Sequence, residues 1–112
     1  MDKPSKIKCL KDAVRLWCLD KGYNEIDGAD LVFQGENKTV GFILKEEKTD
    51  QELLSEIMNA KSICNEIYVV ITDQAERAKT VSIIPKECGL LCYSNPFGLG
   101  YLFEVFKEAA PL

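Results

Sequence analysis

An aspartate and a lysine carry the main chemistry that the sequence offers. Asp30 lies in the segment Gly28-Ala29-Asp30-Leu31-Val32, and Lys45 ends the segment Val40-Gly41-Phe42-Ile43-Leu44-Lys45. A carboxylate and a lysine at the ends of paired strands, followed by a helix, are typical of a hydrolytic metal centre. In such a centre the acid holds Mg²⁺, and the lysine orients or activates the attacking water. We therefore take Asp30 and Lys45 as candidate catalytic residues, and Asp30 as the candidate metal ligand.

Two adjacent antiparallel strands are expected to position this pair. The residues Val40, Phe42 and Leu44 alternate with the residues of a second face that ends at Lys45, as in a half-buried strand. The preceding segment 25–33 is rich in strand-forming residues and broken at Asp27-Gly28, so a short extra strand before Gly28 is also possible. On this interpretation Asp30 lies on the first strand and shares its face with Val32 and Gln34.

The remaining segments predict a layered α/β arrangement. Thr49 and Glu52 fit a capping box that starts a helix, and the apolar run 67–71 is typical of a central strand parallel to a neighbour. The other predictions, in chain order, are a helix over 5–21, the capped helix to about 65, a loop or short helix at 73–80, strands at 81–84 and 90–93, and a closing helix at about 99–109. This order predicts an α/β fold with a mixed central sheet flanked by helices, in a single domain over 1–112.

Taken together, these elements resemble the PD-(D/E)xK, or restriction-endonuclease-like, nuclease superfamily. The chain looks closest to the small forms related to the MmcB-like DNA-repair proteins and to archaeal resolvases. The resemblance extends over roughly residues 7–94, from Trp17 and Lys21-Gly22-Tyr23 through the two strands to the run 67–71 and the segment 84–91. It implies a restriction-endonuclease-like α-β-β-β-α-β core, with Asp30 as the metal-binding aspartate and Lys45 as the motif lysine.

The chain departs from the family pattern at Ile43. The second acid of the motif should stand two residues before the lysine, and a hydrocarbon side chain cannot ligate a cation. The predicted function is therefore a nuclease-fold domain with a degenerate, inactive metal site. Such a domain acts as a nucleic-acid-associated binding or interaction module and needs no cofactor. An active form of the same domain would need Mg²⁺ or Mn²⁺.

Two other functions remain open. An active metal-dependent nuclease would need a relocated acid, for which Glu25, Glu56 and Glu47 are the candidates. A structural or oligomerising protein would use its aromatic C-terminal helix as the interface of a homodimer or with another protein; the aromatic residues of this region are Tyr93, Phe97, Tyr101, Phe103 and Phe106. On a purely structural interpretation, Asp30 bonds turn amides after Gly28 and Lys45 ends an edge strand.

Composition limits the class of protein further. The net charge of −4 disfavours tight binding to duplex nucleic acid and leaves weak contact with DNA or RNA possible. The chain has no histidine, which excludes catalytic sets built on that residue, and its five cysteines are expected to be reduced and mostly buried. A charged N-terminus and the lack of a long apolar run predict a cytoplasmic protein without a membrane partner.

Overall fold

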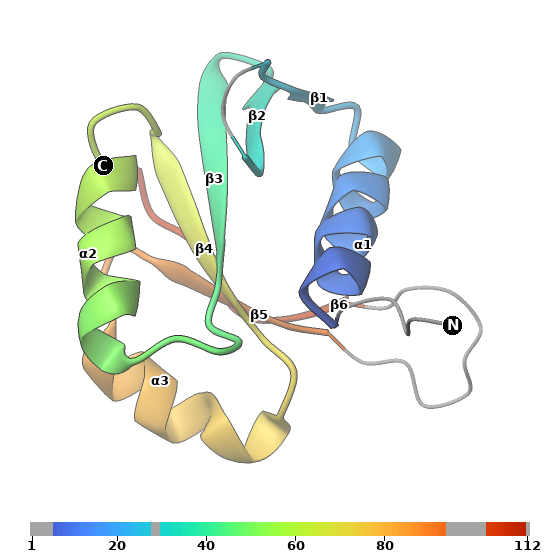
Figure 1. Ribbon diagram of the computed structural model, residues 1–112. Helices are drawn as coiled ribbons and strands as arrows, with labels where there is room; N and C mark the ends of the chain where they lie inside the picture. Colours follow the sequence, from blue (N-terminus) through green and yellow to red (C-terminus); the bar gives the residue numbers. More distant parts are fainter. Residues whose placement is uncertain (1–5, 28–29, 94–102, 112) are drawn as a thin grey trace.

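The computed structural model describes residues 6–27, 30–93 and 103–111 (Figure 1). The elements in chain order are α1 (Lys6–Asp20), β1 (Asn24–Glu25), β2 (Val32–Gly35), β3 (Lys38–Leu44), α2 (Asp50–Ala60), β4 (Glu66–Ile71), the 3₁₀ turn η1 (Gln74–Glu76), α3 (Arg77–Ile83), β5 (Gly89–Tyr93) and β6 (Phe103–Lys107). The predicted α-β-β-β-α-β order is confirmed, and so is the short strand before Gly28.

The strands form one mixed sheet whose spatial order follows the chain, from β1 to β6. Neighbours β1, β2 and β3 are antiparallel, β4 is parallel to both β3 and β5, and β6 is antiparallel to β5. The central, parallel position predicted for 67–71 is confirmed. Because β4 is covered on both faces, its residues from Ile67 to Ile71 are all buried.

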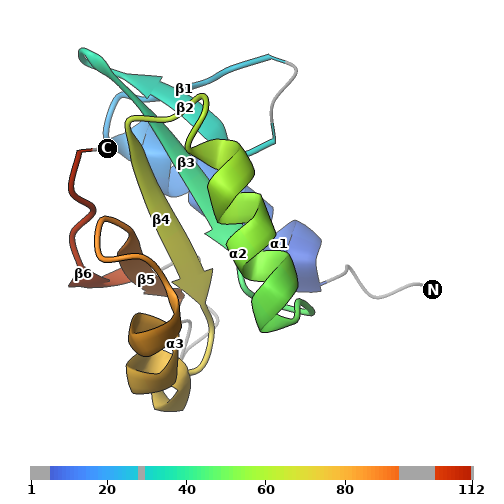
Figure 2. The ribbon, with the colours of Figure 1, turned by 90° about the vertical axis from the view of Figure 1, so that its left-hand side faces the viewer.

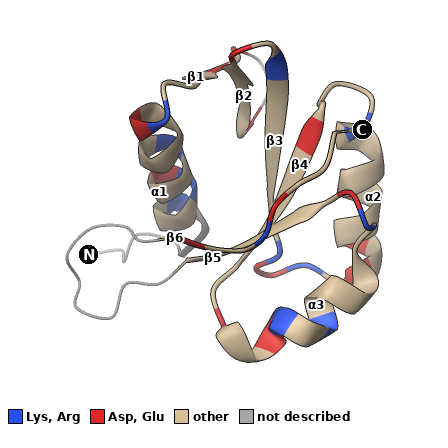
Figure 3. Ribbon diagram, turned by 180° about the vertical axis from the view of Figure 1, so that it is seen from behind, with Lys and Arg blue, Asp and Glu red and all other residues tan. Residues whose placement is uncertain are grey.

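The connections decide which face each helix covers. Crossovers between parallel strands are right-handed as a rule. The crossovers from β3 to β4 and from β4 to β5 both move toward the same edge of the sheet, so their helices lie on the same face. Accordingly α2 and α3 lie together on one face of the sheet, and α1 covers part of the other (Figures 1 and 2). We call these the α2 face and the α1 face. Charge lies mostly on helices, connections and strand ends (Figure 3).

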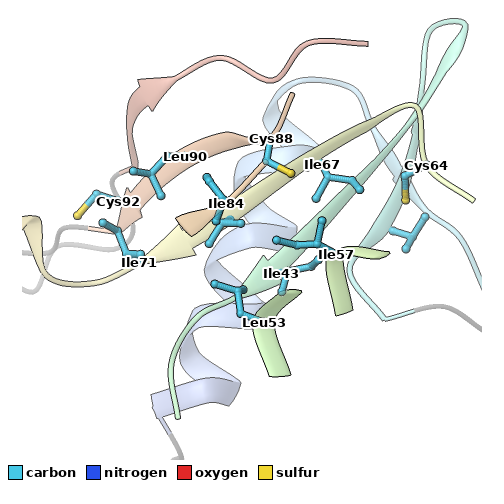
Figure 4. Packing of buried hydrophobic residues seen from close by; sticks show 12 residues of the cluster. Ile43, Leu53, Ile57, Cys64, Ile67, Ile71, Ile84, Cys88, Leu90 and Cys92 are labelled. Atoms are coloured by element: carbon cyan, nitrogen blue, oxygen red, sulfur yellow. The ribbon is translucent and has the colours of Figure 1, made fainter. Parts of the chain in front are cut away.

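The two faces have separate cores. The α2 face carries an aliphatic cluster (Figure 4): Val32, Ile43, Leu53, Ile57, Cys64, Ile67, Val69, Ile71, Ile84, Cys88, Leu90 and Cys92. The α1 face carries an aromatic-rich cluster: Leu10, Val14, Cys18, Leu31, Phe33, Val40, Phe42, Leu44, Tyr68, Val70 and Leu91, with Trp17, Tyr23, Tyr93, Phe103 and Ala109 packed against it. Four of the five cysteines are buried, as predicted, and Cys9 is exposed.

Helix α2 begins as predicted and ends earlier. Thr49 and Glu52 form both hydrogen bonds of a capping box. The helix ends at Ala60 rather than near 65, because the chain turns to start β4. Asn65 is held by Thr39 of β3 in two hydrogen bonds, from the Asn65 amide to the Thr39 carbonyl (2.8 Å) and from the Thr39 amide to the Asn65 side chain (2.8 Å).

Two further secondary-structure predictions were wrong. Residues 81–83 of the segment predicted as a strand belong to α3, and Ile84, which caps that helix, is buried together with Thr80 one turn earlier. The segment predicted as a closing helix contains the strand β6, where pairing of Phe103 with Tyr93 and of Val105 with Leu91 overrides the local helical spacing. The first residues of the predicted closing helix, and the aromatic residues Phe97 and Tyr101, lie outside the described residues. Within the described part of the chain, no helix is both long and apolar enough to cross a membrane.

Candidate functional site

Asp30 lies in the turn before β2 and not on the strand, so its predicted place beside Val32 and Gln34 was wrong. The reason is Leu31, whose φ of 56° turns the backbone into the left-handed region just before the strand. The Leu31 carbonyl accepts a hydrogen bond from the Phe42 amide (3.0 Å), which fixes the turn against β3. The Asp30 side chain is bonded to residues of α1 instead.

Two cations of α1 bind the Asp30 carboxylate. Its Oδ2 accepts from Lys11 Nζ, and its Oδ1 accepts from Arg15 Nη2 at 3.3 Å. Arg15 also donates from Nε to Glu25 Oε1 at 3.0 Å, and the other Glu25 oxygen accepts from the Leu31 amide at 3.3 Å. Glu25, one of the candidate relocated acids, is therefore linked to Asp30 through Arg15. Hydrogen bonding to Glu25 above all raises the pKa of Arg15, so the guanidinium stays charged.

Lys45 lies elsewhere, one residue beyond the end of β3. Its amide donates to Val70 of β4 (3.0 Å), and its Nζ pairs with Glu76 of η1 at 3.3 Å. The side chain is 11% exposed. Because β3 is an internal strand of the sheet, the interpretation of Lys45 as the end of an edge strand was wrong.

The predicted site residues divide between two hollows. The first, of about 510 Å³, lies over β3 beside α2 and is lined by Asp30, Ile43 and Glu56; we call it the β3 hollow. The second, of about 390 Å³, lies at the ends of β3 and β4 and is lined by Lys45 and Glu47; we call it the strand-end pocket. The structure thus places Asp30 and Glu56 at the same hollow, and Lys45 with Glu47 at a different one.

Ile43 forms part of the floor of the β3 hollow and also packs in the aliphatic cluster, with Leu53 and Ile57 of α2 (Figure 4). Its side chain is 8% exposed. Gly41, two residues earlier on the same face of β3, and Ala60 of α2 add further apolar floor. Position 43, where the resemblance to the PD-(D/E)xK superfamily would call for an acid, is therefore occupied by a hydrocarbon side chain that packs in the core.

The charged rim of the β3 hollow consists of ion pairs. Lys11 and Arg15 bind Asp30 at one side, and Lys48 binds Glu56 at the other, with Nζ to Oε2 at 3.2 Å. Lys48 Nζ also donates to the Leu44 carbonyl at 2.6 Å, which ties the rim to the end of β3. Each carboxylate of this hollow therefore has a cation of the chain already bound to it.

The side chains around the β3 hollow do not fit the Mg²⁺ or Mn²⁺ that the resemblance implies. A divalent ion at Asp30 would have to displace two cationic side chains, and the next position toward the sheet offers the methyl groups of Ile43 in place of oxygen. In the part of the chain that the structure describes, no group of three or more aspartate, glutamate, cysteine or histidine residues could hold a metal ion.

Sequence reasoning missed the partners of the predicted acids. Lys11 and Arg15 are one helical turn apart on α1, so their shared side of the helix could have been found from spacing alone. Residue spacing does not predict how α1 packs against the sheet, so it could not show that this side of the helix faces Asp30. The sequence analysis also did not single out Lys48, which lines both hollows.

Comparisons of the chain with protein-family models, with curated proteins and with solved structures find no match in any of the three.

Proposed function

We propose that the chain is a restriction-endonuclease-like domain that no longer cleaves and that acts as a nucleic-acid-associated binding module, in DNA repair or a related process. The observation that carries the proposal is Ile43, a buried hydrocarbon at the floor of the hollow that Asp30 and Glu56 share. The α-β-β-β-α-β order supports the family, and the ion pairs around the hollow support the loss of metal chemistry.

A row of cations on α1 is the surface that we assign to nucleic acid. Lys8, Lys11 and Arg15 follow one another at spacings of three and four, so they lie along one side of the helix. Lys11 and Arg15 are partly neutralised by Asp30 and Glu25, and the chain as a whole carries −4. Binding should therefore be weak, with dissociation constants of roughly 10⁻⁴ to 10⁻⁶ M, and should fall steeply with salt.

One observation favours the rival function of an active nuclease. Glu56, one of the candidate relocated acids, lines the same hollow as Asp30. In that case Asp30 and Glu56 would hold the ion, which would supply an activated water, and Lys11, Arg15 and Lys48 would have to leave the two carboxylates. The two functions differ in whether phosphodiester bonds are broken.

A cleavage assay separates them. Labelled single-stranded and duplex DNA and RNA are incubated with the protein and Mg²⁺ or Mn²⁺, alongside Asp30→Asn, Glu56→Gln and Lys45→Ala variants. We expect no cleavage above background in any sample. Cleavage by the native chain that disappears in Asp30→Asn and Glu56→Gln, and persists in the control Lys86→Ala, would overturn the proposal.

Fluorescence anisotropy with the same oligonucleotides tests the binding half of the proposal. Lys8→Gln should weaken binding and lower the slope of log affinity against log salt by about one, as expected for one lost phosphate contact. Lys86→Gln removes the same charge from an exposed position between α3 and β5 and should leave both quantities unchanged. Absence of any binding at low salt, or equal effects of the two variants, would contradict the assignment.

A further inference from the structure

A third hollow, of about 230 Å³, lies on the α1 face at the beginnings of β3 and β4. The C-terminal end of α1 contributes Trp17, the following turn contributes Tyr23, and the two strands contribute Phe42 and Tyr68. It opens at the end of the sheet opposite the strand-end pocket. We call it the aromatic pocket.

Two glycines leave the space that the tyrosine rings occupy. A Cβ on Gly35 would lie 2.8 Å from the Tyr23 ring, so the missing side chain lets that ring lie against the β2–β3 hairpin. A Cβ on Gly89 would lie 2.4 Å from the Tyr68 ring and 2.7 Å from the Ala109 amide nitrogen. The ring of Tyr68 is also stacked on that of Phe42, with centroids 5.7 Å apart and planes 14° from parallel. The Phe42 and Tyr68 rings are therefore packed against each other without any ligand, and Tyr23 lies close to the hairpin.

Charged groups of both signs surround these rings. Lys21 Nζ lies over the Trp17 ring, 4.5 Å from its centroid, and Lys38 Nζ lies 5.7 Å from the centroid of Tyr23. Lys38 also pairs with Glu66 at 3.3 Å. The pocket thus offers ammonium donors and a carboxylate acceptor beside aromatic faces.

The Tyr68 hydroxyl completes this polar rim. It donates to Glu108 Oε2 at 2.7 Å, which ties the C-terminal segment to β4. Burial raises the pKa of Tyr68, so the hydroxyl remains a donor at neutral pH. A second carboxylate, that of Glu108, therefore lies at the pocket, and the ammonium and carboxylate groups balance.

This combination selects against simple ions. A cation would meet Lys21 and Lys38, and an anion would meet Glu66 and Glu108. A neutral planar ring with both donors and acceptors on its edge matches the aromatic faces and the mixed rim together. We infer that the aromatic pocket binds a single nucleobase, an inference that deepens the proposed function and rests on it.

The base could come from a free nucleotide or from an unpaired position in a single strand. In either case the ring would displace the flexible Lys21 side chain from the face of Trp17, and the freed ammonium would be available for the phosphate. A base within a duplex is excluded, because its faces are covered by its neighbours in the stack.

The experiment uses Trp17, the only tryptophan in the chain, as its reporter. Adenosine and guanosine monophosphates, a mixed-sequence single strand and its duplex are each titrated into the full chain while tryptophan fluorescence is recorded. We expect saturable quenching by the monophosphates or the single strand and none by the duplex. Saturation at lower concentration of monophosphate than of bases in the strand identifies a free nucleotide as the source, and the reverse order identifies the strand.

Variants at the rim locate the contact. Lys21→Ala and Glu66→Gln should each weaken binding about two- to tenfold, the size expected for one lost hydrogen bond. Tyr23→Leu should weaken it about tenfold, because it removes a stacking face. Lys86→Ala makes the same change in charge as Lys21→Ala at an exposed position that does not line the pocket and should leave affinity unchanged.

Non-saturable quenching, or equal affinities of Lys21→Ala and Lys86→Ala, would overturn the inference. Oligonucleotide binding that leaves Trp17 fluorescence unchanged would overturn it too, while the proposed function would stand. Saturable quenching together with metal-dependent cleavage would support the nucleobase site and contradict the proposed non-cleaving function.

Discussion

The two faces of the sheet share the strand β3 and differ in the chemistry that they offer. On the α2 face, Gly41 and Ile43 form a hydrocarbon floor between paired charges. On the α1 face, Val40 and Phe42 of the same strand belong to a cluster rich in aromatic rings. Side-chain alternation along one strand therefore gives each face its own hollow, one without the acid that metal catalysis needs and one with rings on which a base could stack.

The difference separates the face that is occupied by packing from the face that is free to bind a ligand. The aliphatic face is committed to packing, because Ile43 serves the core beneath α2 and α3. The aromatic face has α1 over only part of the sheet, and its rim residues are charged and partly exposed. Changes on the aliphatic face should alter stability, and changes at the aromatic rim should alter binding.

The largest expected effect is the loss of packing on the aliphatic face. Ile57→Ala removes a fully buried side chain of α2 and should lower the free energy of unfolding by about 2–5 kcal/mol. Met58, its neighbour, is 65% exposed, so Met58→Ala should change that free energy by less than about 0.5 kcal/mol. Urea unfolding of both variants gives the two values. Similar losses would show that α2 does not bury the face that the structure assigns to it.

A smaller effect is expected where β3 meets the chain after α2. A Cβ on Gly41 would lie 2.7 Å from Cys64 Sγ, so Gly41→Ala should destabilise the protein by about 1–3 kcal/mol. Cys64→Ala removes the clashing sulfur, and in its background Gly41→Ala should cost much less. A double-mutant cycle from urea unfolding measures this coupling. Strictly additive effects would mean that the two side chains do not meet.

The buried thiols predict a gradual loss of stability at alkaline pH. Burial raises the pKa of Cys18 to about 12, and it also raises the pKa values of Cys64, Cys88 and Cys92. A thiol with a raised pKa in the native state ionises first in the unfolded chain, so its contribution is complete below about pH 9 and is lost as pH rises toward 12.

For Cys18 the slope should reach about 1.4 kcal/mol per pH unit within that window. Cys18→Ala should lower the pH dependence of the free energy of unfolding between pH 8 and pH 10, and Cys9→Ala, at an exposed position, should leave it as it is. Urea unfolding across this range measures both. An unchanged slope in Cys18→Ala would contradict the buried position of that thiol on the α1 face.

The elements that have a clear local sequence pattern were predicted correctly. The alternation of β3, the unbroken apolar run of β4 and the Thr49–Glu52 capping box each specify their element within a few residues. The strand β6 could not be predicted in this way, because its conformation depends on pairing with β5. Residues 81–84 were ambiguous because a short apolar run fits a buried helix turn as well as a strand.

The candidate site was predictable in composition and not in geometry. The sequence identified Asp30, Ile43 and three candidate acids. Of these acids, Glu25 shares Arg15 with Asp30 and Glu56 lines the same hollow as Asp30, whereas Glu47 lies in the strand-end pocket. The sequence did not show that Leu31 turns the chain, that α1 supplies two cations, or that Lys45 faces Glu76. These features depend on the packing of elements distant in sequence.

Titration of Mn²⁺ into the native chain, Ile43→Glu and Ile43→Gln, followed by electron paramagnetic resonance, tests the central claim about β3 most directly. Glutamate at position 43 would add a carboxylate to the hollow of Asp30 and Glu56, and glutamine adds the same shape without the charge. We expect saturable Mn²⁺ binding by Ile43→Glu alone. Tight binding by the native chain that is lost in Asp30→Asn would contradict the account, because the hollow would then hold a metal ion despite Ile43.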